Sequence, residues 1–272
     1  NPQKVERFTR VPAETITALA REIANTEGVS LHAFTGLEYS NCGMQSIRAL
    51  YILWAITGNL DVPGGLYLTA PRGRTPQDKF PKPAGILPVG AEKYPLFCEL
   101  TGSAQFMEFP RAVLDEEPYP VKGLLVIGSS ILTSYPQPKI FEEAFRKLDF
   151  MMVVDLVLTR DALFADVILP SATYYETNSY QRYPGYVRLR RRVIEPVGQS
   201  KNCAMIMTEL AERFGYGHLF PQSEEELVEK AFAGNPALLK NLQNSCDGVK
   251  IPVPERCYKK YELVHRPTSS FP

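Results

Sequence analysis

The sequence predicts an α/β fold built on an open, mostly parallel sheet with helices on both faces. Three short apolar runs have the length of buried parallel strands, and each is closed by a residue that ends strands. These are residues 124–127, 150–154 and 166–169, closed by Gly128, Asp155 and Pro170. Apolar residues at helical spacing lie between the first two runs, from Ile140 to Leu148. Strand, helix, strand, short crossover and strand is the order of an open, Rossmann-like sheet.

Residues 1–68 are predicted to form a first αβα part of the cofactor-binding domain. Pro12 suits the first turn of a helix, where its missing N–H costs nothing, and Gly28 ends that helix. Residues 29–34 are predicted to form a short strand. Residues 43–57 are predicted to form a long, mostly apolar helix.

Prolines are concentrated in residues 69–121, which excludes long helices and central strands there. Because apolar side chains recur along this stretch, we predict a long loop that wraps over the domain, with one short helix within residues 97–109. Residues 122–215 form the predicted βαβ core that binds the cofactor. Residues 216–272 are predicted to form short helices followed by an irregular tail.

Structural signals continue through the last part of the chain. Residues 187–193 alternate between apolar and basic side chains, as an amphipathic strand does. Residues 204–214 have the apolar spacing of a helix. Ser223 and Glu226 form a capping box, and Asn235 before a proline marks another helix start.

Composition narrows the classes of function. Thirty basic residues balance thirty acidic ones, so the bulk charge predicts no nucleic-acid partner. No apolar run approaches the ~20 residues of a membrane span, so none is predicted in this chain. Five widely spaced cysteines without a C-x-x-C pair predict buried free thiols, not a disulfide framework or a zinc or iron–sulfur site. Three scattered histidines support no catalytic triad and no metal site.

Candidate binding residues follow the strand ends, because ligands of open α/β sheets bind outside the carboxyl ends of the strands. Gly128, Ser129 and Ser130 lead toward a helix near Gln137, and free loop N–H groups at such a place can bind phosphate. The helix dipole adds only ~0.3–1 kcal/mol per charge, so several N–H groups must share the contact.

The carboxylate of Asp155 can accept from both N1–H and the exocyclic amino group of guanine. Its alternative role is that of a cap for the helix or turn at Leu158 to Leu163. Thr159 and Asp166 are further candidates, although Asp166 can merely cap the turn before its own strand. A nicotinamide site would use a strand-end acid for a ribose hydroxyl, but no G-x-G-x-x-G follows Ile127.

Two sets of motifs, in a consistent order, resemble the molybdopterin oxidoreductases, which include dimethyl sulfoxide reductase, formate dehydrogenase and nitrate reductase. The downstream set is Val126-Ile127-Gly128, Asp155 with Thr159, Ala165 to Pro170, and Glu176. The upstream set is Val11 to Glu14, Arg48-Ala49, Thr57-Gly58-Asn59 and Pro63-Gly64-Gly65. The resemblance covers roughly residues 5–215.

The resemblance implies an enzyme of two-electron redox or oxygen-atom transfer, as in anaerobic respiration. Its cofactor would be a bis-molybdopterin guanine dinucleotide centre holding molybdenum or tungsten. This chain would bind one of the two guanine dinucleotide pterins through Gly128, Ser129, Ser130, Asp155, Thr159 and Asp166. No position here matches the family's metal-ligand motif, so the metal ligand and any iron–sulfur cluster are expected in other segments. We therefore expect an internal piece of a larger enzyme, inactive by itself.

The expected partners are a small-molecule substrate, the remaining segments of the catalytic subunit and an iron–sulfur electron-transfer subunit. The compartment, cytoplasmic or periplasmic in a prokaryote, is left open. The sequence departs from the family pattern after Glu176, where residues 177–180 replace a glycine-threonine-asparagine pattern, and at Ser129-Ser130, where an asparagine-proline pair is usual. The alternatives are a non-catalytic scaffold resembling the large peripheral subunit of NADH dehydrogenases, and a nicotinamide- or flavin-dependent α/β enzyme.

Overall fold

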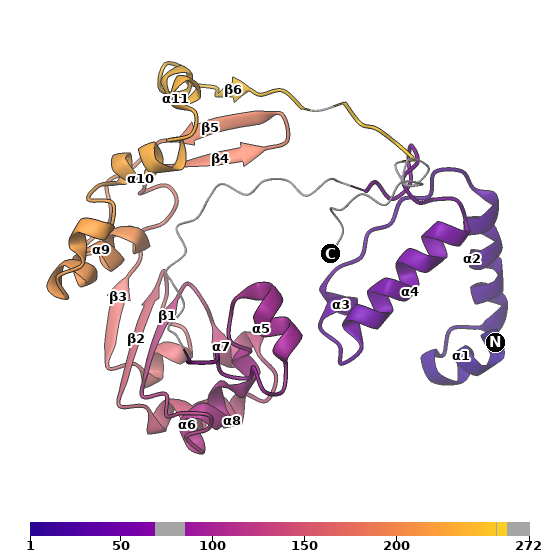
Figure 1. Ribbon diagram of the computed structural model, residues 1–272, viewed down its shortest axis with the longest axis horizontal. Coiled ribbons are helices and arrows are strands. Elements are labelled where there is room, and N and C mark those ends of the chain that lie inside the picture. The colour runs from indigo at the N-terminus through magenta and orange to yellow at the C-terminus, as the bar shows by residue number, and fades with distance from the viewer. Residues whose placement is uncertain (69–84, 254, 260–272) are drawn as a thin grey trace. The chain divides into compact units, whose positions relative to one another are not determined.

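The computed structural model describes residues 1–68, 85–253 and 255–259. The chain divides into two compact units, residues 1–76 with 254–272 and residues 77–253. Figure 1 shows the helical first unit and the second unit, which holds both sheets. The predicted α/β class is confirmed, since the second unit contains a parallel three-stranded sheet with helices beside it.

Helices make up the first unit within the described residues. They are α1 (Pro2–Thr9), α2 (Ala13–Asn25), α3 (Thr35–Glu38) and α4 (Gly43–Ile56). The predicted strand at residues 29–34 is wrong, because this segment is irregular and pairs with no strand in the described part of the chain. Side chains meet its backbone instead: Val29 N–H donates to Asn59 Oδ1 at 2.8 Å, and Trp54 Nε1 donates to the Val29 carbonyl at 2.8 Å. The first part is therefore helical, not αβα.

Short helices occupy the described part of the proline-rich stretch. They are α5 (Pro95–Thr101), the 3-10 helix η1 (Phe106–Glu108) and α6 (Phe109–Leu114). Residues 69–84 of the predicted loop lie outside the described residues. Instead of one helix within residues 97–109, the chain forms two α-helices and a 3-10 turn, each started near a proline or by a side-chain cap. Phe106, Phe109 and Val113 pack into the core of the second unit, as the apolar pattern predicted.

The parallel sheet consists of three strands in the order of the chain. They are β1 (Gly123–Ile127), β2 (Phe150–Asp155) and β3 (Val167–Pro170). Ile127 pairs with Val154, and Asp155 pairs with Pro170. The short helix α7 (Ile131–Ser134) and the helix α8 (Pro138–Lys147) form the crossover from β1 to β2. The 3-10 helix η2 (Asp161–Phe164) joins β2 to β3.

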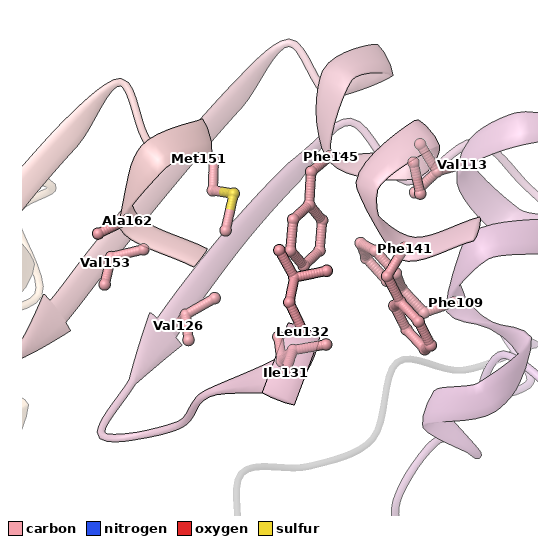
Figure 2. Close-up of a cluster of buried hydrophobic side chains, with 11 residues drawn as sticks. Phe109, Val113, Val126, Ile131, Leu132, Phe141, Phe145, Met151, Val153 and Ala162 are labelled. Carbon is pink, nitrogen blue, oxygen red and sulfur yellow. The ribbon is translucent and has the colours of Figure 1, made fainter. Parts of the chain in front are cut away.

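Apolar cores cover both faces of the central strand β2, which explains its continuous apolar run, whereas Leu125, Ile127 and Ile168 of the two outer strands are exposed. On one face, Met151 and Val153 pack with Phe141 and Phe145 of α8 (Figure 2). On the other face, Met152 and Val154 pack against helix α9 (Cys203–Arg213) through Ile206. Alternate residues of β2 thus face opposite cores. The prediction of helices on both faces is confirmed.

A small antiparallel sheet follows, in the order β4 (Ser179–Tyr183), β5 (Tyr186–Arg190) and β6 (Val249–Lys250). The predicted strand at residues 187–193 is confirmed in its first part, whereas β4 and β6 were not predicted. The remaining elements are η3 (Gly217–Leu219), α10 (Glu224–Ala231) and α11 (Pro236–Gln243).

The two predicted helix caps are present, and the cysteines form no disulfides. Ser223 Oγ accepts from Glu226 N–H at 3.1 Å, and Asn235 Oδ1 accepts from Leu238 N–H at 3.1 Å, which confirms both helix starts. All five cysteines are free, but only Cys98 is buried, so the prediction of buried thiols is wrong for most of them. No helix in the described ranges has the length and apolar character needed to cross a membrane.

Candidate functional site

The carboxyl ends of the three parallel strands lie side by side at one edge of the sheet. Gly128 N–H donates to the Val154 carbonyl at 2.9 Å, which continues the ladder between β1 and β2. Ser171 N–H donates to the Asp155 carbonyl at 3.0 Å, which continues the ladder between β2 and β3. Gly128, Asp155 and Ser171 therefore form one row, with neighbouring strands about 4.8 Å apart. This row is the candidate site.

The loop after β1 leaves backbone donors unused. Gly128 has a φ of 58°, a left-handed conformation that a residue with a side chain adopts only at a cost. Its role is conformational, because an added Cβ would meet nothing within 4 Å. The N–H groups of Ser129 and Ser130 have no acceptor among the described residues. The Ser130 hydroxyl is paired with Thr133 Oγ1 at 3.1 Å.

A buried carboxylate that was not predicted as a site residue fixes this loop. Asp161 is fully buried, and its side chain accepts from Ile131 N–H at 2.5 Å and Leu132 N–H at 2.9 Å. The helix predicted near Gln137 is α8, and the short helix α7 lies between it and the loop of Gly128 to Ser130. The first two N–H groups of α7 already bind Asp161. The N–H groups left for an anion are those of Ser129 and Ser130.

Asp155 binds the N–H of the next residue with one carboxylate oxygen and keeps the other open. Its Oδ1 accepts from Leu156 N–H at 2.6 Å. No donor in the described part of the chain reaches its Oδ2. The side chain is half-buried at the end of β2, so the open oxygen can meet a ligand. Asp155 thus binds the N–H of the next residue and does not cap the turn at Leu158 to Leu163, and the contact to a base stays a prediction.

Thr159 provides an unpaired polar atom next to this row. Its Oγ1 is buried and has no hydrogen-bond partner among the described residues. A buried hydroxyl without a partner costs ~1–3 kcal/mol, and nearly all such groups in folded proteins are paired. The Thr159 hydroxyl is therefore a place where a further polar group fits.

Asp166 lies at the opposite edge of the sheet. It precedes β3, its Oδ2 accepts from Met151 N–H at 2.7 Å, and its own N–H donates to the Met151 carbonyl at 2.8 Å. Four residues of strand, about 13 Å, separate it from the carboxyl end of β3. Asp166 therefore caps the start of β2 and is not brought together with Ser129, Ser130 and Asp155.

The loop after β3 is fastened by Glu176. Its carboxylate is buried and accepts from Thr173 N–H and Val197 N–H, each at 2.7 Å. These hydrogen bonds, that of Thr173 foremost, hold the pKa of Glu176 below its ordinary value. The segment from Ser171 to Thr177 is thereby held at the carboxyl edge. Glu176 belonged to the motif that carried the family resemblance, but its positioning role was not predicted.

The described residues provide an α/β scaffold for a ligand, without a metal-binding cluster of their own. No group of three or more His, Cys, Asp or Glu side chains in the described ranges is arranged to hold a metal ion. What the edge offers is donors and acceptors for an organic ligand: two free N–H groups, one open carboxylate oxygen and one buried hydroxyl. A nucleotide-binding open-sheet α/β protein has this form.

Comparisons with known proteins agree with this class. Residues 101–213 match the molybdopterin oxidoreductase family. The F420-dependent formate dehydrogenase subunit alpha of Methanocaldococcus jannaschii is 28% identical over 245 residues, covering 83% of this chain and 35% of that protein. The dimethyl sulfoxide/trimethylamine N-oxide reductase of Rhodobacter capsulatus is 27% identical over 264 residues, covering 89% and 32%.

A solved structure shows the same fold. Acetylene hydratase from Pelobacter acetylenicus superimposes with a TM-score of 0.73 at 22% identity, over 93% of this chain and 39% of that one. The chain spans about a third of the length of the curated relatives named above. The match of residues 101–213 and the similarity to these relatives confirm the resemblance to the molybdopterin oxidoreductases that was drawn from the motifs.

Proposed function

We propose that this chain is part of a molybdenum- or tungsten-dependent oxidoreductase and binds one molybdopterin guanine dinucleotide of a bis-pterin centre. The family match and the oxidoreductases among its relatives support the enzyme class. The observation that carries the binding role is the row of strand ends, where unused donors and an open acceptor lie next to one another. The substrate is proposed to be a small molecule, bound with the help of segments beyond this chain.

The loop after β1 is proposed to bind the diphosphate. Ser129 and Ser130 present consecutive free N–H groups, the kind of donor that phosphate oxygens take at loop ends. Gly128 sets the left-handed turn that directs the chain into this loop. The Asp161 carboxylate holds the following helix in place, so the loop is ordered before the ligand binds.

Asp155 is proposed to recognise the guanine base. A carboxylate offers acceptors to the N1–H and amino donors of guanine, and Asp155 Oδ2 is open for that contact. The buried Thr159 hydroxyl, lacking a protein partner, suits a contact to the same ligand. When bound, the metal and pterin supply two-electron redox chemistry. The residues of this chain bind and orient the nucleotide end.

Relatives with names such as "subunit alpha" support a multisubunit enzyme. We propose that the chain works with the remaining segments of the catalytic subunit and with an iron–sulfur electron-transfer subunit. We propose that the iron–sulfur cluster and the protein ligand to the metal belong to those other segments, because no position of this sequence matches the family's metal-ligand motif.

The test is the cofactor content of the full-length protein carrying Asp155→Ala. We expect a loss of guanine nucleotide, about tenfold or more in affinity, because a charged hydrogen bond of ~1.5–3 kcal/mol is removed. Guanine nucleotide released by acid is quantified by chromatography, and molybdenum and tungsten by mass spectrometry. Asp149→Ala is the matched control: this exposed carboxylate precedes the same strand at its opposite end and meets only Lys122, at 3.7 Å.

Wild-type guanine content in the Asp155→Ala protein would refute the assignment of the base contact. Absence of any guanine nucleotide and of both metals from the wild-type protein would instead favour the scaffold alternative. A nicotinamide or flavin released in place of guanine nucleotide would favour the third class of protein.

A further inference from the structure

A polar pocket, separate from the candidate site, opens beside the carboxyl end of β3. It has a volume of about 300 Å³ and lies between the loop after β3, the strand β5 and the start of α9. Its polar lining includes Ser171, Thr177, Arg190, Asn202 and Cys203. The pocket belongs entirely to the second unit and uses none of the residues assigned above to the guanine nucleotide.

Arg190 brings a positive charge to this pocket with incomplete hydrogen bonding. Its Nη2 donates to Thr177 Oγ1 at 3.1 Å, and its guanidinium lies 5.7 Å from the centre of the Tyr174 ring. Its Nε is buried and has no partner among the described residues. No carboxylate of the described chain forms an ion pair with it. A buried guanidinium nitrogen with no acceptor is costly, and an oxyanion is the group that its planar fork matches best.

The start of α9 contributes a positive electrostatic potential to the same pocket. This helix of 11 residues begins at Cys203, and Asn202 caps it by accepting from Ala204 N–H at 2.9 Å. Asn202 and Cys203 line the pocket, so the positive end of the helix dipole lies at its wall. The Ser171 hydroxyl, also in the lining, donates to the Ala172 carbonyl at 3.3 Å and lies 3.1 Å from the Cys203 thiol. The nearby carboxylate of Glu224 accepts hydrogen bonds from Asn178 N–H and from the side-chain amide of Asn202.

We propose that this pocket binds a small oxyanion of the carboxylate or phosphate class, with Arg190 as its charged partner. The guanidinium of Arg190 and the start of α9 line the same pocket, and both favour negative charge there. A volume of about 300 Å³ is at the small end of ligand sites, so it suits an anionic group, not a whole dinucleotide. The inference stands independently of the proposed function.

The experiment titrates inorganic phosphate, and separately formate, into the full-length protein at constant ionic strength by calorimetry. Alkylation of Cys203 by iodoacetamide, followed by peptide mass spectrometry, locates the bound anion, with the exposed Cys246 as an internal reference. Bound anion should slow the alkylation of Cys203 and leave that of Cys246 unchanged. Arg190→Gln should weaken anion binding about 10- to 100-fold, the effect of losing one charged hydrogen-bonding partner.

Arg188→Gln is the matched control, because it removes the same charge two residues away on β5. Arg188 is exposed and donates to Gln181 Oε1 at 2.8 Å, so its loss should change binding less than about twofold. Arg190→Lys keeps the charge without the planar fork and should fall between wild type and Arg190→Gln. Equal effects of Arg188→Gln and Arg190→Gln would overturn the proposal.

Two sources of the oxyanion are distinguished by preparing the protein with and without its cofactor. Protection of Cys203 that needs added phosphate or formate in both forms identifies a free anion. Protection already present in the cofactor-loaded form alone identifies an anionic group of the cofactor. If neither form shows protection or binding that depends on Arg190, the pocket holds no oxyanion. The guanine content measured for Asp155→Ala has no bearing on these outcomes.

Discussion

Replacing Asp161 should release the loop that follows β1. Its carboxylate is fully buried and accepts from Ile131 N–H at 2.5 Å and from Leu132 N–H at 2.9 Å. Asp161→Ala leaves both donors without a partner. Asp161→Asn keeps the shape and one carbonyl acceptor but turns an NH₂ group toward the other donor. The two substitutions therefore remove different shares of the same contact.

The magnitude follows from the number of donors left unpaired. Each buried donor without a partner costs about 1–3 kcal/mol, which gives about 2–6 kcal/mol for two. Water that enters the space left by the side chain reduces this cost, so we expect about 3 kcal/mol for Asp161→Ala and about half of that for Asp161→Asn. At 1.4 kcal/mol per factor of ten, local opening becomes roughly 100-fold and tenfold more frequent, respectively.

Hydrogen exchange of the full-length protein measures this opening directly. Peptides covering residues 128–135 should exchange faster by those factors in the two variants, while peptides covering β2 keep most of their protection. Asp149→Ala, an exposed carboxylate beside Lys122, should leave residues 128–135 unchanged. If residues 128–135 exchange as slowly in Asp161→Ala as in the wild type, the buried carboxylate does not hold this loop.

Two further predictions concern the same edge of the sheet. Gly128→Ala should destabilise the loop by about 1–2 kcal/mol through its left-handed backbone, seen as faster local exchange. Gly123→Ala, whose Cβ would lie 3.8 Å from the Phe150 carbonyl in ordinary contact, should be close to neutral, and equal effects would contradict this. Because backbone donors lower the pKa of Glu176, its contribution to stability is complete above the ordinary value of 4.5 and is lost as pH falls below it. The difference in Tm between wild type and Glu176→Gln should therefore narrow at acid pH, and a constant difference would exclude this linkage.

The parallel sheet could be predicted because local sequence carries its signal. The central strand β2 is covered on both faces and is continuously apolar, and β1 and β3 also have short apolar runs, so all three stand out against their flanks. The caps of α10 and α11 were equally local, since each depends on a side chain and an N–H three residues later. The observed order β1-β2-β3 agrees with the tendency of consecutive strands to lie side by side.

The remaining strands depended on pairing between distant residues. Residues 29–34 have the composition of a strand, but no second strand in the described part of the chain pairs with them, and Asn59 and Trp54 satisfy the Val29 backbone. In contrast, β4 is a polar segment and β6 has two residues, so neither has an apolar pattern of its own. Both are strands because β5 offers them hydrogen bonds. Propensity is weak evidence where pairing decides the outcome.

A residue of the candidate site could be predicted only where the sequence shows whether it follows or precedes a strand. Asp155 closes an apolar run and Asp166 opens one, so the direction of the strands puts them at opposite edges of a parallel sheet. Asp161 could not be assigned in this way, because its partners Ile131 and Leu132 lie about thirty residues away. Its position in a short connection between apolar residues was the only available signal.

The sequence of chemical groups along the edge limits which ligand can bind across it. Strand ends are about 4.8 Å apart, so the row from β1 to β3 spans about 10 Å. Along that row lie the free N–H groups of Ser129 and Ser130, the open oxygen of Asp155, and the pocket in which Ser171 and Arg190 take part. A uniformly anionic ligand would be repelled by Asp155, and a ligand without anionic groups would leave the N–H groups of Ser129 and Ser130 unpaired. The edge therefore favours a molecule that has anionic groups and also hydrogen-bond donors, as the guanine nucleotide proposed above does.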